Sequence, residues 1–132
     1  AAIGSSQLSK IQMISESRRK VCQIYNEQFT SISEIRPPLT DFRDITPFLY
    51  YIRVPENKRD ALRKHMLEHG VDTGIHWQPG HWFTLFKDCK KGNLTVTDKV
   101  GKEILSLPLH SNMSDENIQQ VVACVKSFRW RS

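Results

Sequence analysis

The sequence predicts an α+β fold in which a long N-terminal helix precedes a small, mainly antiparallel sheet covered by helices. Apolar residues recur at helical spacing through the first part of the chain, from Ser6 to about Phe29. Beyond it, short aromatic or β-branched runs alternate with segments whose apolar residues follow a helical period. The length of 132 residues suits one domain, which we place over residues 1–132.

The first predicted element is this N-terminal helix. Arg18 interrupts its apolar stripe on the inner face, so we expect a carboxylate or carbonyl partner, with a structural ion pair as the default. The consecutive prolines that follow, Pro37 and Pro38, exclude a helix there. The apolar residues of the stripe are Leu8, Ile11, Ile14, Cys22, Tyr25 and Phe29.

The middle of the chain predicts a strand, a helix and a second strand. The first strand, Phe48 to Val54, alternates so that Phe48, Tyr50, Ile52 and Val54 lie on one side. The helix is predicted to begin at the N-cap Asn57 and to end before Gly70, a left-handed stop. Thr73 to Trp77 is the second strand. The inward residues of the helix are Leu62, Met66 and Leu67.

The last third predicts a helix, an extended piece and a terminal helix. Thr95 or Thr97 is expected to cap a helix that runs through Ile104. The residues after it, to Leu109, read as an extended segment that Pro108 places at a sheet edge. Ser114 is expected to cap the terminal helix. The core-facing stripe of that helix is Ile118, Val121, Val122, Val125 and Phe128.

The composition indicates which cellular compartment to expect. No window approaches the roughly 18 apolar residues that a membrane span needs, so no membrane contact is expected. The three cysteines, Cys22, Cys89 and Cys124, are widely spaced, and an odd number without CxxC spacing indicates free thiols in a reducing compartment. We therefore expect a cytoplasmic protein. The N-terminus lacks a methionine and a signal-peptide pattern, and reads as a cut inside a longer polypeptide.

The formal charge of +5 raises the question of a nucleic-acid partner. The basic residues are scattered along the chain and mostly lie beside acids, so a solvated surface is the preferred interpretation and no nucleic acid is expected. A modest positive field would also suit an anionic small ligand such as a nucleotide diphosphate. A basic nucleic-acid binder stays as a separate hypothesis, which predicts affinity falling steeply with salt.

The candidate site is the segment around the turn Gln78-Pro79-Gly80, which gathers His76, Trp77, His81 and Trp82. Loop aromatics either pack in the core or stack on a ligand ring, and both interpretations are open for the tryptophans. His110, at the end of an extended segment, faces either a cleft or water.

No metal site, P-loop or dinucleotide fingerprint is expected. His76 and His81 flank a turn and lack the further ligands that a metal pair needs. His65 and His69 share a helical face at i and i+4, and we interpret both as solvated, with His69 suited to a helix C-terminus. The six glycines form neither GxGxxG nor GxxxxGK[ST].

Four landmarks, in order, resemble the C-terminal part of the DegT/DnrJ/EryC1/StrS sugar aminotransferases, and together they cover nearly the whole chain. They are Ala2-Ile3-Gly4 followed by Gln7-Leu8; Arg18 and then Tyr25; Gly74 to His81; and Ile104 to Leu109 before Ser114 and a Val-rich helix.

This resemblance implies an enzyme that uses pyridoxal phosphate (PLP) to move an amino group, typically from glutamate, onto a keto-sugar linked to a nucleotide diphosphate. The products feed lipopolysaccharide, capsule or antibiotic sugars, and the enzymes dimerise. The C-terminal domain of such an enzyme closes over the sugar nucleotide. The resemblance therefore implies substrate contact for His76 and His81, then for Trp77 and Trp82, with His110 as a further candidate.

The family's Schiff-base lysine and the acid facing the pyridine nitrogen lie in a large domain upstream of the segment that resembles this chain. Ser15 to Lys20 reproduces the serine-to-lysine spacing, but it lacks the flanking aromatic and glycine residues and lies within a helix. We expect no catalytic or cofactor-binding residue here, so that PLP would bind only in the complete enzyme. The alternative is a stand-alone, non-catalytic sugar-nucleotide-binding module. In either case the apolar surface left without the large domain predicts self-association.

Overall fold

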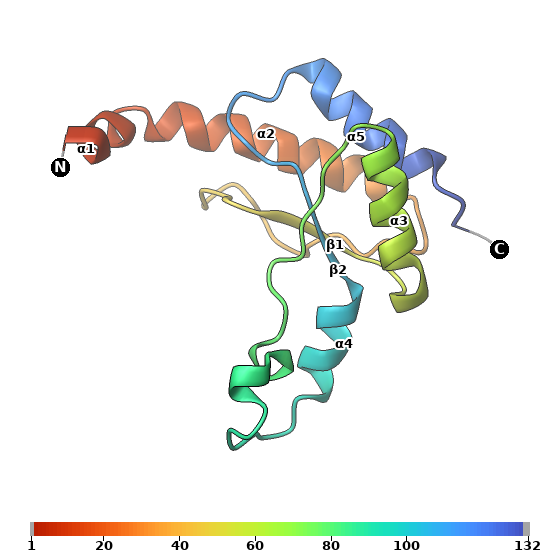
Figure 1. Ribbon diagram of the computed structural model, residues 1–132. Helices are drawn as coiled ribbons and strands as arrows, with labels where there is room; N and C mark the ends of the chain where they lie inside the picture. Colours follow the sequence, from red (N-terminus) through yellow and green to blue (C-terminus); the bar gives the residue numbers. More distant parts are fainter. Residues whose placement is uncertain (1, 131–132) are drawn as a thin grey trace.

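A computed structural model of the chain describes residues 2–130. Helices surround a two-stranded antiparallel sheet at the centre of the molecule (Figure 1). The helices are α1 (Ala2–Leu8), α2 (Ile11–Phe29), α3 (Glu56–Glu68), α4 (Thr95–Glu103) and α5 (Asp115–Ser127), with 3-10 turns η1 (Gly80–Trp82) and η2 (Thr84–Phe86). The strands are β1 (Tyr50–Arg53) and β2 (Ile104–Leu107).

Single bridges extend the sheet on both sides. In the central pair, Tyr50 lies opposite Leu107 and Arg53 opposite Ile104. On the β1 side Arg36 pairs with Arg53, and on the β2 side Gly74 pairs with Ser106. Segments far apart in the sequence are thereby held side by side, because each bridge exchanges two backbone hydrogen bonds.

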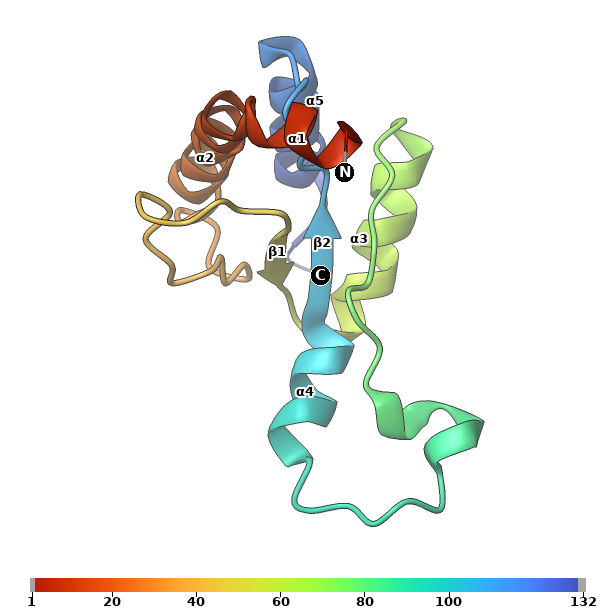
Figure 2. The ribbon, with the colours of Figure 1, turned by 90° about the vertical axis from the view of Figure 1, so that its left-hand side faces the viewer.

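The core lies where α2, α3 and α5 pack around the sheet (Figure 2). The Tyr25 ring of α2 lies 5.5 Å from that of Phe29 and 5.0 Å from that of Tyr50, measured between ring centroids. All three side chains are fully buried. Aromatic side chains of this size bury a large apolar area, so this cluster joins the first long helix to the sheet.

Residues 75–103, which we call the arm, extend away from the three core helices (Figure 1). The arm contains both 3-10 turns and α4, and α4 leads directly into β2. Its buried residues are small or polar, namely Pro79, Gly101 and Glu103. Glu103 receives two hydrogen bonds from the Arg53 guanidinium, at 2.7 and 3.0 Å, which attach the base of the arm to β1.

The predicted α+β class, with its small antiparallel sheet and covering helices, is confirmed. Ser114 caps α5 in a capping box, in which its hydroxyl accepts from the Asn117 backbone and the Asn117 side chain accepts from the Ser114 backbone. Gly70 has a φ of 75°, the left-handed geometry expected of a helix stop. Cys22 and Cys124 are buried in the core, whereas Cys89 is exposed.

The predicted N-terminal helix is interrupted. It divides into α1 and α2 at Ser9-Lys10, where the Ser9 hydroxyl donates to the Ser6 carbonyl at 2.9 Å and competes with the helical ladder. Leu8 and Ile11 are exposed rather than buried, because no described element packs against this end. The apolar stripe reaches the core only from Val21 onward.

Two predictions in the middle of the chain are wrong because apolar side chains turn away from the core. Phe48 is exposed, since β1 begins only at Tyr50. Leu67 is exposed because the buried face of α3 carries Leu62 and Met66, and a neighbour of Met66 points about 100° away.

Three predicted boundaries also shift. Thr73 to Trp77 forms one bridge instead of a strand. Helix α3 begins at Glu56 after Pro55, so Asn57 is not its N-cap, because the Pro55 carbonyl already accepts from the Lys58 amide. Neither Thr95 nor Thr97 caps α4.

The start of α4 is fixed by a side chain that precedes it. The Asn93 side-chain oxygen accepts from the Thr95 amide at 3.0 Å and from the Thr95 hydroxyl at 2.7 Å. Pro108 follows β2 rather than marking a free edge, since β2 is bridged on both sides. Both the contacts of Asn93 and the surroundings of Pro108 depend on how the neighbouring loops fold back.

Arg18 has the carbonyl partner that was one of its two expected alternatives, not the default ion pair, and His65 differs from expectation. Arg18 donates to the Pro47 carbonyl at 3.3 Å, and no described carboxylate pairs with it. His65 is half-buried between α3 and α5 rather than solvated. Among residues 2–130, no helix has both the length and the apolar character needed to cross a bilayer.

Candidate functional site

The segment before the arm borders a cavity of about 530 Å³ beside the end of β2. Three stretches of chain form its walls: the entry to β1, the segment after α3, and the exit from β2. The lining residues are Phe48, Leu49, Asp72, Thr73, Gly74, His76, Trp77, Ser106, Leu107, Pro108 and Leu109. The Gly74–Ser106 bridge holds the second stretch against the third.

An aromatic pair stands at one side of this cavity. The rings of Phe48 and Trp77 lie 6.5 Å apart between centroids, with an angle of 29° between their planes. Trp77 is 68% exposed and Phe48 is 69% exposed, so each keeps an apolar face open to solvent. Exposed, stacked aromatics next to a cavity are suited to packing against a ligand ring.

The cavity wall also contains polar side chains. The hydroxyl oxygens of Thr73 and Ser106 are buried and have no hydrogen-bond partner among residues 2–130. A buried hydroxyl without a partner costs roughly 1–3 kcal/mol. Because both oxygens are shielded from solvent, they add polar groups to the wall but are not open to a ligand in the cavity.

Gly74 allows His76 to fold back onto the backbone. A Cβ at position 74 would overlap His76 Cε1 and lie 2.8 Å from its Nδ1, so a side chain there would displace the ring. The absence of a side chain at Gly74 thus sets the position of the His76 ring at the cavity.

His81 and Trp82 are directed elsewhere. His81 Nε2 lies 2.7 Å from Asp98 Oδ1, and Trp82 Nε1 donates to the same oxygen at 2.7 Å. Because an ionised carboxylate only accepts, the proton of His81 is placed on Nε2. The hydrogen bonds from Trp82 and His81 lower the pKa of Asp98 below its ordinary value. These contacts fasten η1 to α4.

A close backbone approach supports the same attachment. A Cβ at Gly101 would lie 2.5 Å from Pro79 Cγ and 3.1 Å from the Trp82 ring, so the turn can lie on α4 only because position 101 is glycine. A smaller cavity of about 370 Å³ opens between this part of α4 and Trp77.

The five predicted site residues therefore separate into three places. His76 and Trp77 line the cavity, His81 and Trp82 bind Asp98, and His110 is exposed just beyond the cavity residue Leu109. Sequence reasoning missed Phe48, Thr73, Ser106 and Asp98. The first three occupied predicted strands, where they read as packing residues, and no local pattern links Asp98 to the turn.

The cavity residues do not fit PLP. Its lining contains no lysine, whereas the coenzyme needs an enclosed lysine for its Schiff base. The lysines of the described residues are exposed, except the half-buried Lys58.

Comparison with known structures defines the class. The crystal structure of the aminotransferase TlmJ from Streptoalloteichus hindustanus matches this fold with a TM-score of 0.86 at 26% identity, over 95% of this chain and 34% of that one. The sequence profile of the DegT/DnrJ/EryC1/StrS aminotransferase family matches residues 1–126, and the chain belongs to this family. The family is PLP-dependent.

Two curated relatives are sugar aminotransferases by name. A dTDP-4-dehydro-2,3,6-trideoxy-D-glucose 4-aminotransferase of Saccharopolyspora spinosa is 27% identical over 124 residues, which cover 92% of this chain and 31% of the relative. A dTDP-3-amino-3,6-dideoxy-alpha-D-galactopyranose transaminase of Aneurinibacillus thermoaerophilus is 27% identical over 129 residues, covering 97% of this chain and 35% of the relative. The chain thus spans about a third of the length of these relatives.

Proposed function

We propose that the chain is the C-terminal, substrate-covering domain of a PLP-dependent aminotransferase that acts on a nucleotide-linked keto-sugar. The family match over residues 1–126 supports the reaction class. Both named relatives act on dTDP-sugars, which supports the substrate class. The observation that carries the proposal is the cavity itself, which is lined by His76 and by the open aromatic pair of Phe48 and Trp77.

Each part of the cavity has a role in holding a sugar. The carboxylate of Asp72, an exposed residue of the lining, can accept hydrogen bonds from sugar hydroxyl groups. The face of Trp77 packs against the apolar face of a sugar ring or against a nucleobase. His76, held at the rim by Gly74, adds one further donor or acceptor. In this role the domain binds and orients the substrate and excludes water from it.

PLP, when bound in the complete enzyme, supplies the chemistry of amino-group transfer. The lysine that holds it belongs, in this proposal, to a large domain outside this chain. Glutamate is the proposed amino donor, and its site likewise lies outside the described cavity. His81 and Trp82 then support the substrate segment indirectly, through Asp98.

The proposed setting is the biosynthesis of surface polysaccharide or a related sugar in the cytoplasm. Three cysteines without a disulfide are consistent with a reducing compartment. The complete enzyme is proposed to form a homo-oligomer with active sites at the subunit boundary. The stand-alone binding module shares the cavity but lacks the chemistry, so the two proposals differ only in what happens when the large domain is present.

The binding role is tested by titrating a dTDP-sugar into the chain at millimolar concentrations and following it by calorimetry or NMR. Trp77→Ala is expected to weaken binding roughly two- to tenfold, because an aromatic contact contributes about 0.5–1.5 kcal/mol. Phe86→Ala is the matched control, since Phe86 is an exposed aromatic of the arm that does not line the cavity.

Absence of any binding by the folded chain, or equal losses in the two variants, would contradict the proposed site. Mixing the chain with a PLP-binding large domain then separates the enzyme from the stand-alone module: amination supports the first, and a folded but silent complex supports the second. An oligonucleotide that shifts only at low salt would instead favour a basic nucleic-acid binder.

A further inference from the structure

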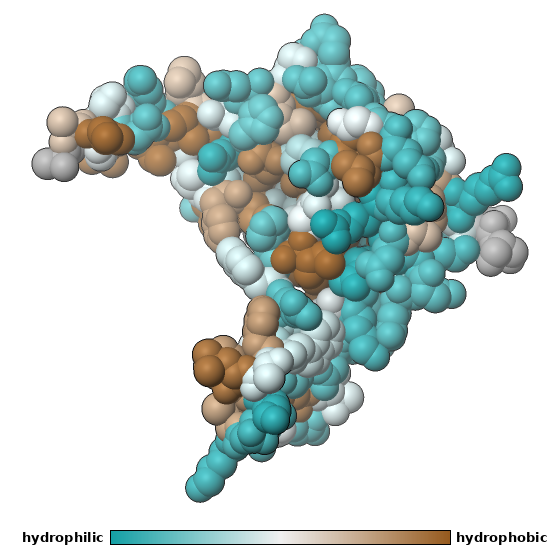
Figure 3. Space-filling view, viewed as in Figure 1, coloured by the Kyte–Doolittle hydropathy of each residue, from teal (hydrophilic) through white to brown (hydrophobic). Residues whose placement is uncertain are grey.

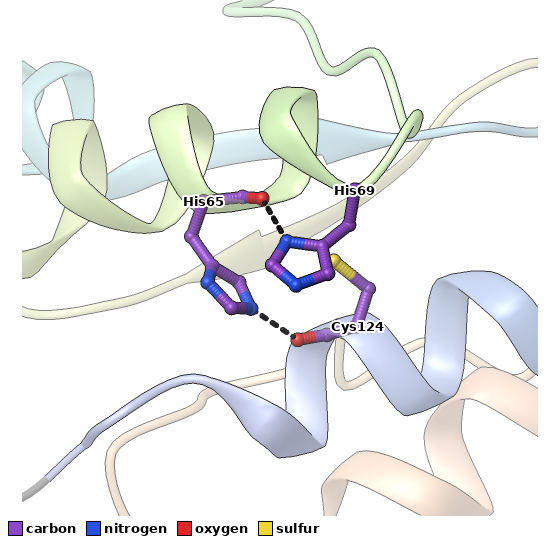
Figure 4. Close-up of side chains that lie close together, drawn as sticks. All are labelled: His65, His69 and Cys124. Atoms are coloured by element: carbon purple, nitrogen blue, oxygen red, sulfur yellow. Dashed lines mark hydrogen bonds between the residues drawn. The ribbon is translucent and has the colours of Figure 1, made fainter.

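Two histidines and a cysteine meet at the contact between α3 and α5. His65 lies in the last turn of α3 and His69 is its C-cap, one turn further on, and Cys124 faces them from α5 (Figure 4). One side-chain ligand atom from each residue lies within 4.8 Å of the other two. None of the three lines the cavity described above.

The orientation of His69 leaves one nitrogen available. Its Nδ1 lies 2.8 Å from the His65 carbonyl oxygen, which can only accept, so Nδ1 carries the proton and the lone pair is on Nε2. Metal-binding histidines are commonly held in this way, with the second ring nitrogen donating to a carbonyl or carboxylate.

His65 points across the same gap. Its Nε2 lies 3.2 Å from the Cys124 carbonyl oxygen and 3.1 Å from the Ser127 hydroxyl oxygen. Ser127 also donates to the Cys124 carbonyl at 2.9 Å, so this carbonyl keeps a partner if His65 turns to another ligand. The two imidazole rings are already in contact, with centroids 4.2 Å apart.

From this geometry we propose that His65, His69 and Cys124 form a zinc site that links α3 to α5. One thiolate and two imidazoles without a carboxylate suit Zn²⁺ and exclude the oxygen-seeking Ca²⁺ and Mg²⁺. A water molecule completes the tetrahedron. On binding, the Cys124 S–H bond breaks, an S–Zn bond forms, and the proton leaves to water.

The three ligand atoms need to approach one another only slightly to bind zinc. Zinc binds nitrogen at about 2.0–2.1 Å and sulfur at about 2.3 Å, so its ligand atoms lie about 3.3–3.6 Å apart. The present limit of 4.8 Å requires an approach of about 1 Å, which side-chain rotation supplies. Burial raises the pKa of the Cys124 thiol, so the metal must displace a bound proton and does not meet a preformed thiolate.

The test is a titration of the reduced chain with Co²⁺, followed by competition with Zn²⁺. We expect one equivalent to bind, with a sulfur-to-cobalt charge-transfer band and tetrahedral d–d bands that Zn²⁺ abolishes. Loss of an outer-shell partner of a metal ligand typically lowers metal affinity by about 10- to 100-fold. His69→Ala and Cys124→Ser each remove a ligand itself, so each should weaken binding by at least this factor. Cys124→Ser should also abolish the charge-transfer band.

Cys89→Ser is the matched control, since Cys89 is exposed and distant in sequence from the cluster, and it should bind as the unaltered chain does. His69 is exposed, so its replacement leaves the fold intact even if the buried Cys124 variant does not fold. The proposal is overturned if the unaltered chain binds no Co²⁺, if the band depends on Cys89, or if binding survives in folded His69→Ala.

Discussion

At the scale of single residues, Asp98 organises the turn that sequence reasoning singled out for its histidines and tryptophans. One oxygen of this carboxylate accepts from the Trp82 indole and faces the His81 ring, both at 2.7 Å. The two side chains thereby become part of the support of the arm, while His76 and Trp77 remain at the cavity. The side chains of this short segment therefore have different roles, which depend on where each side chain finds a polar partner.

The lowered pKa of Asp98 predicts an acid-sensitive contact. A carboxyl group whose folded pKa is depressed stabilises the folded state above its unfolded pKa of about 3.9, and this contribution is lost as the pH falls through the folded value. The Trp82 indole N–H resonance should therefore shift as the pH falls below about 4.

Asp98→Asn, which keeps the size but not the charge, should remove this acid step. The readout must be specific to Trp82, because Asp41 and Glu116 also have lowered pKa values and titrate in the same range. A step that persists unchanged in Asp98→Asn would assign the transition to another carboxylate.

Residue types, but not their partners, could be predicted from the sequence at this scale. Arg18 was expected to have a carboxylate or carbonyl partner and has the Pro47 carbonyl, a choice that depends on a loop far along the chain. His65 and His69 were recognised as one helical face, but Cys124 reaches them only because α5 packs on α3. Contacts of this kind depend on tertiary structure and leave no local pattern.

At the scale of elements, the arm depends on a close approach between α4 and the turn before it. Pro79 and Trp82 lie against Gly101, where a side chain would overlap both. The same arm has few large buried side chains, so this contact is a major part of what fixes its geometry.

Gly101→Ala is predicted to destabilise the arm by about 1–3 kcal/mol, the usual cost of overpacking, even though alanine is the better helix former. Hydrogen exchange of the α4 amides is the measurement, with faster exchange expected in the variant. Gly80→Ala is the matched control, because nothing lies within 4 Å of a Cβ at Gly80. Equal protection of α4 in both variants would show that the approach contributes nothing.

The elements themselves were predicted well wherever their pattern had a partner to pack against. The terminal helix, with its cap at Ser114 and its buried stripe, was predicted correctly because α2 and α3 cover that stripe. The same kind of stripe failed at Leu8 and Ile11, where none of residues 2–130 covers it, and the Thr73 to Trp77 strand is reduced to the Gly74 bridge. Periodicity identifies an apolar face, not whether a neighbour is present.

At the scale of the whole molecule, apolar side chains are exposed at two places far from the core, over α1 with the start of α2 and over the arm (Figure 3). The first group is Ile3, Leu8, Ile11 and Met13, with exposed fractions from 45% to 82%. The second includes Trp77, Phe83, Leu85 and Phe86. Large exposed apolar side chains gathered in this way are typical of an interface.

We therefore predict that the isolated chain self-associates at high concentration through the α1 end. Light scattering should give a mass that rises with concentration, and Leu8→Lys should return it to that of a monomer without loss of helix content. Val96→Lys is the control, since Val96 is similarly exposed but lies on α4. A monomer at every concentration would contradict this expectation.

The central claim is that this domain covers the substrate while the coenzyme is held elsewhere. It is tested most directly by adding PLP, glutamate and a nucleotide-linked keto-sugar to the purified chain. We predict that the sugar nucleotide binds, that no internal aldimine absorbance develops, and that no amino-sugar forms until a PLP-binding large domain is supplied. Aldimine absorbance together with amino-sugar production by the chain alone would contradict the account.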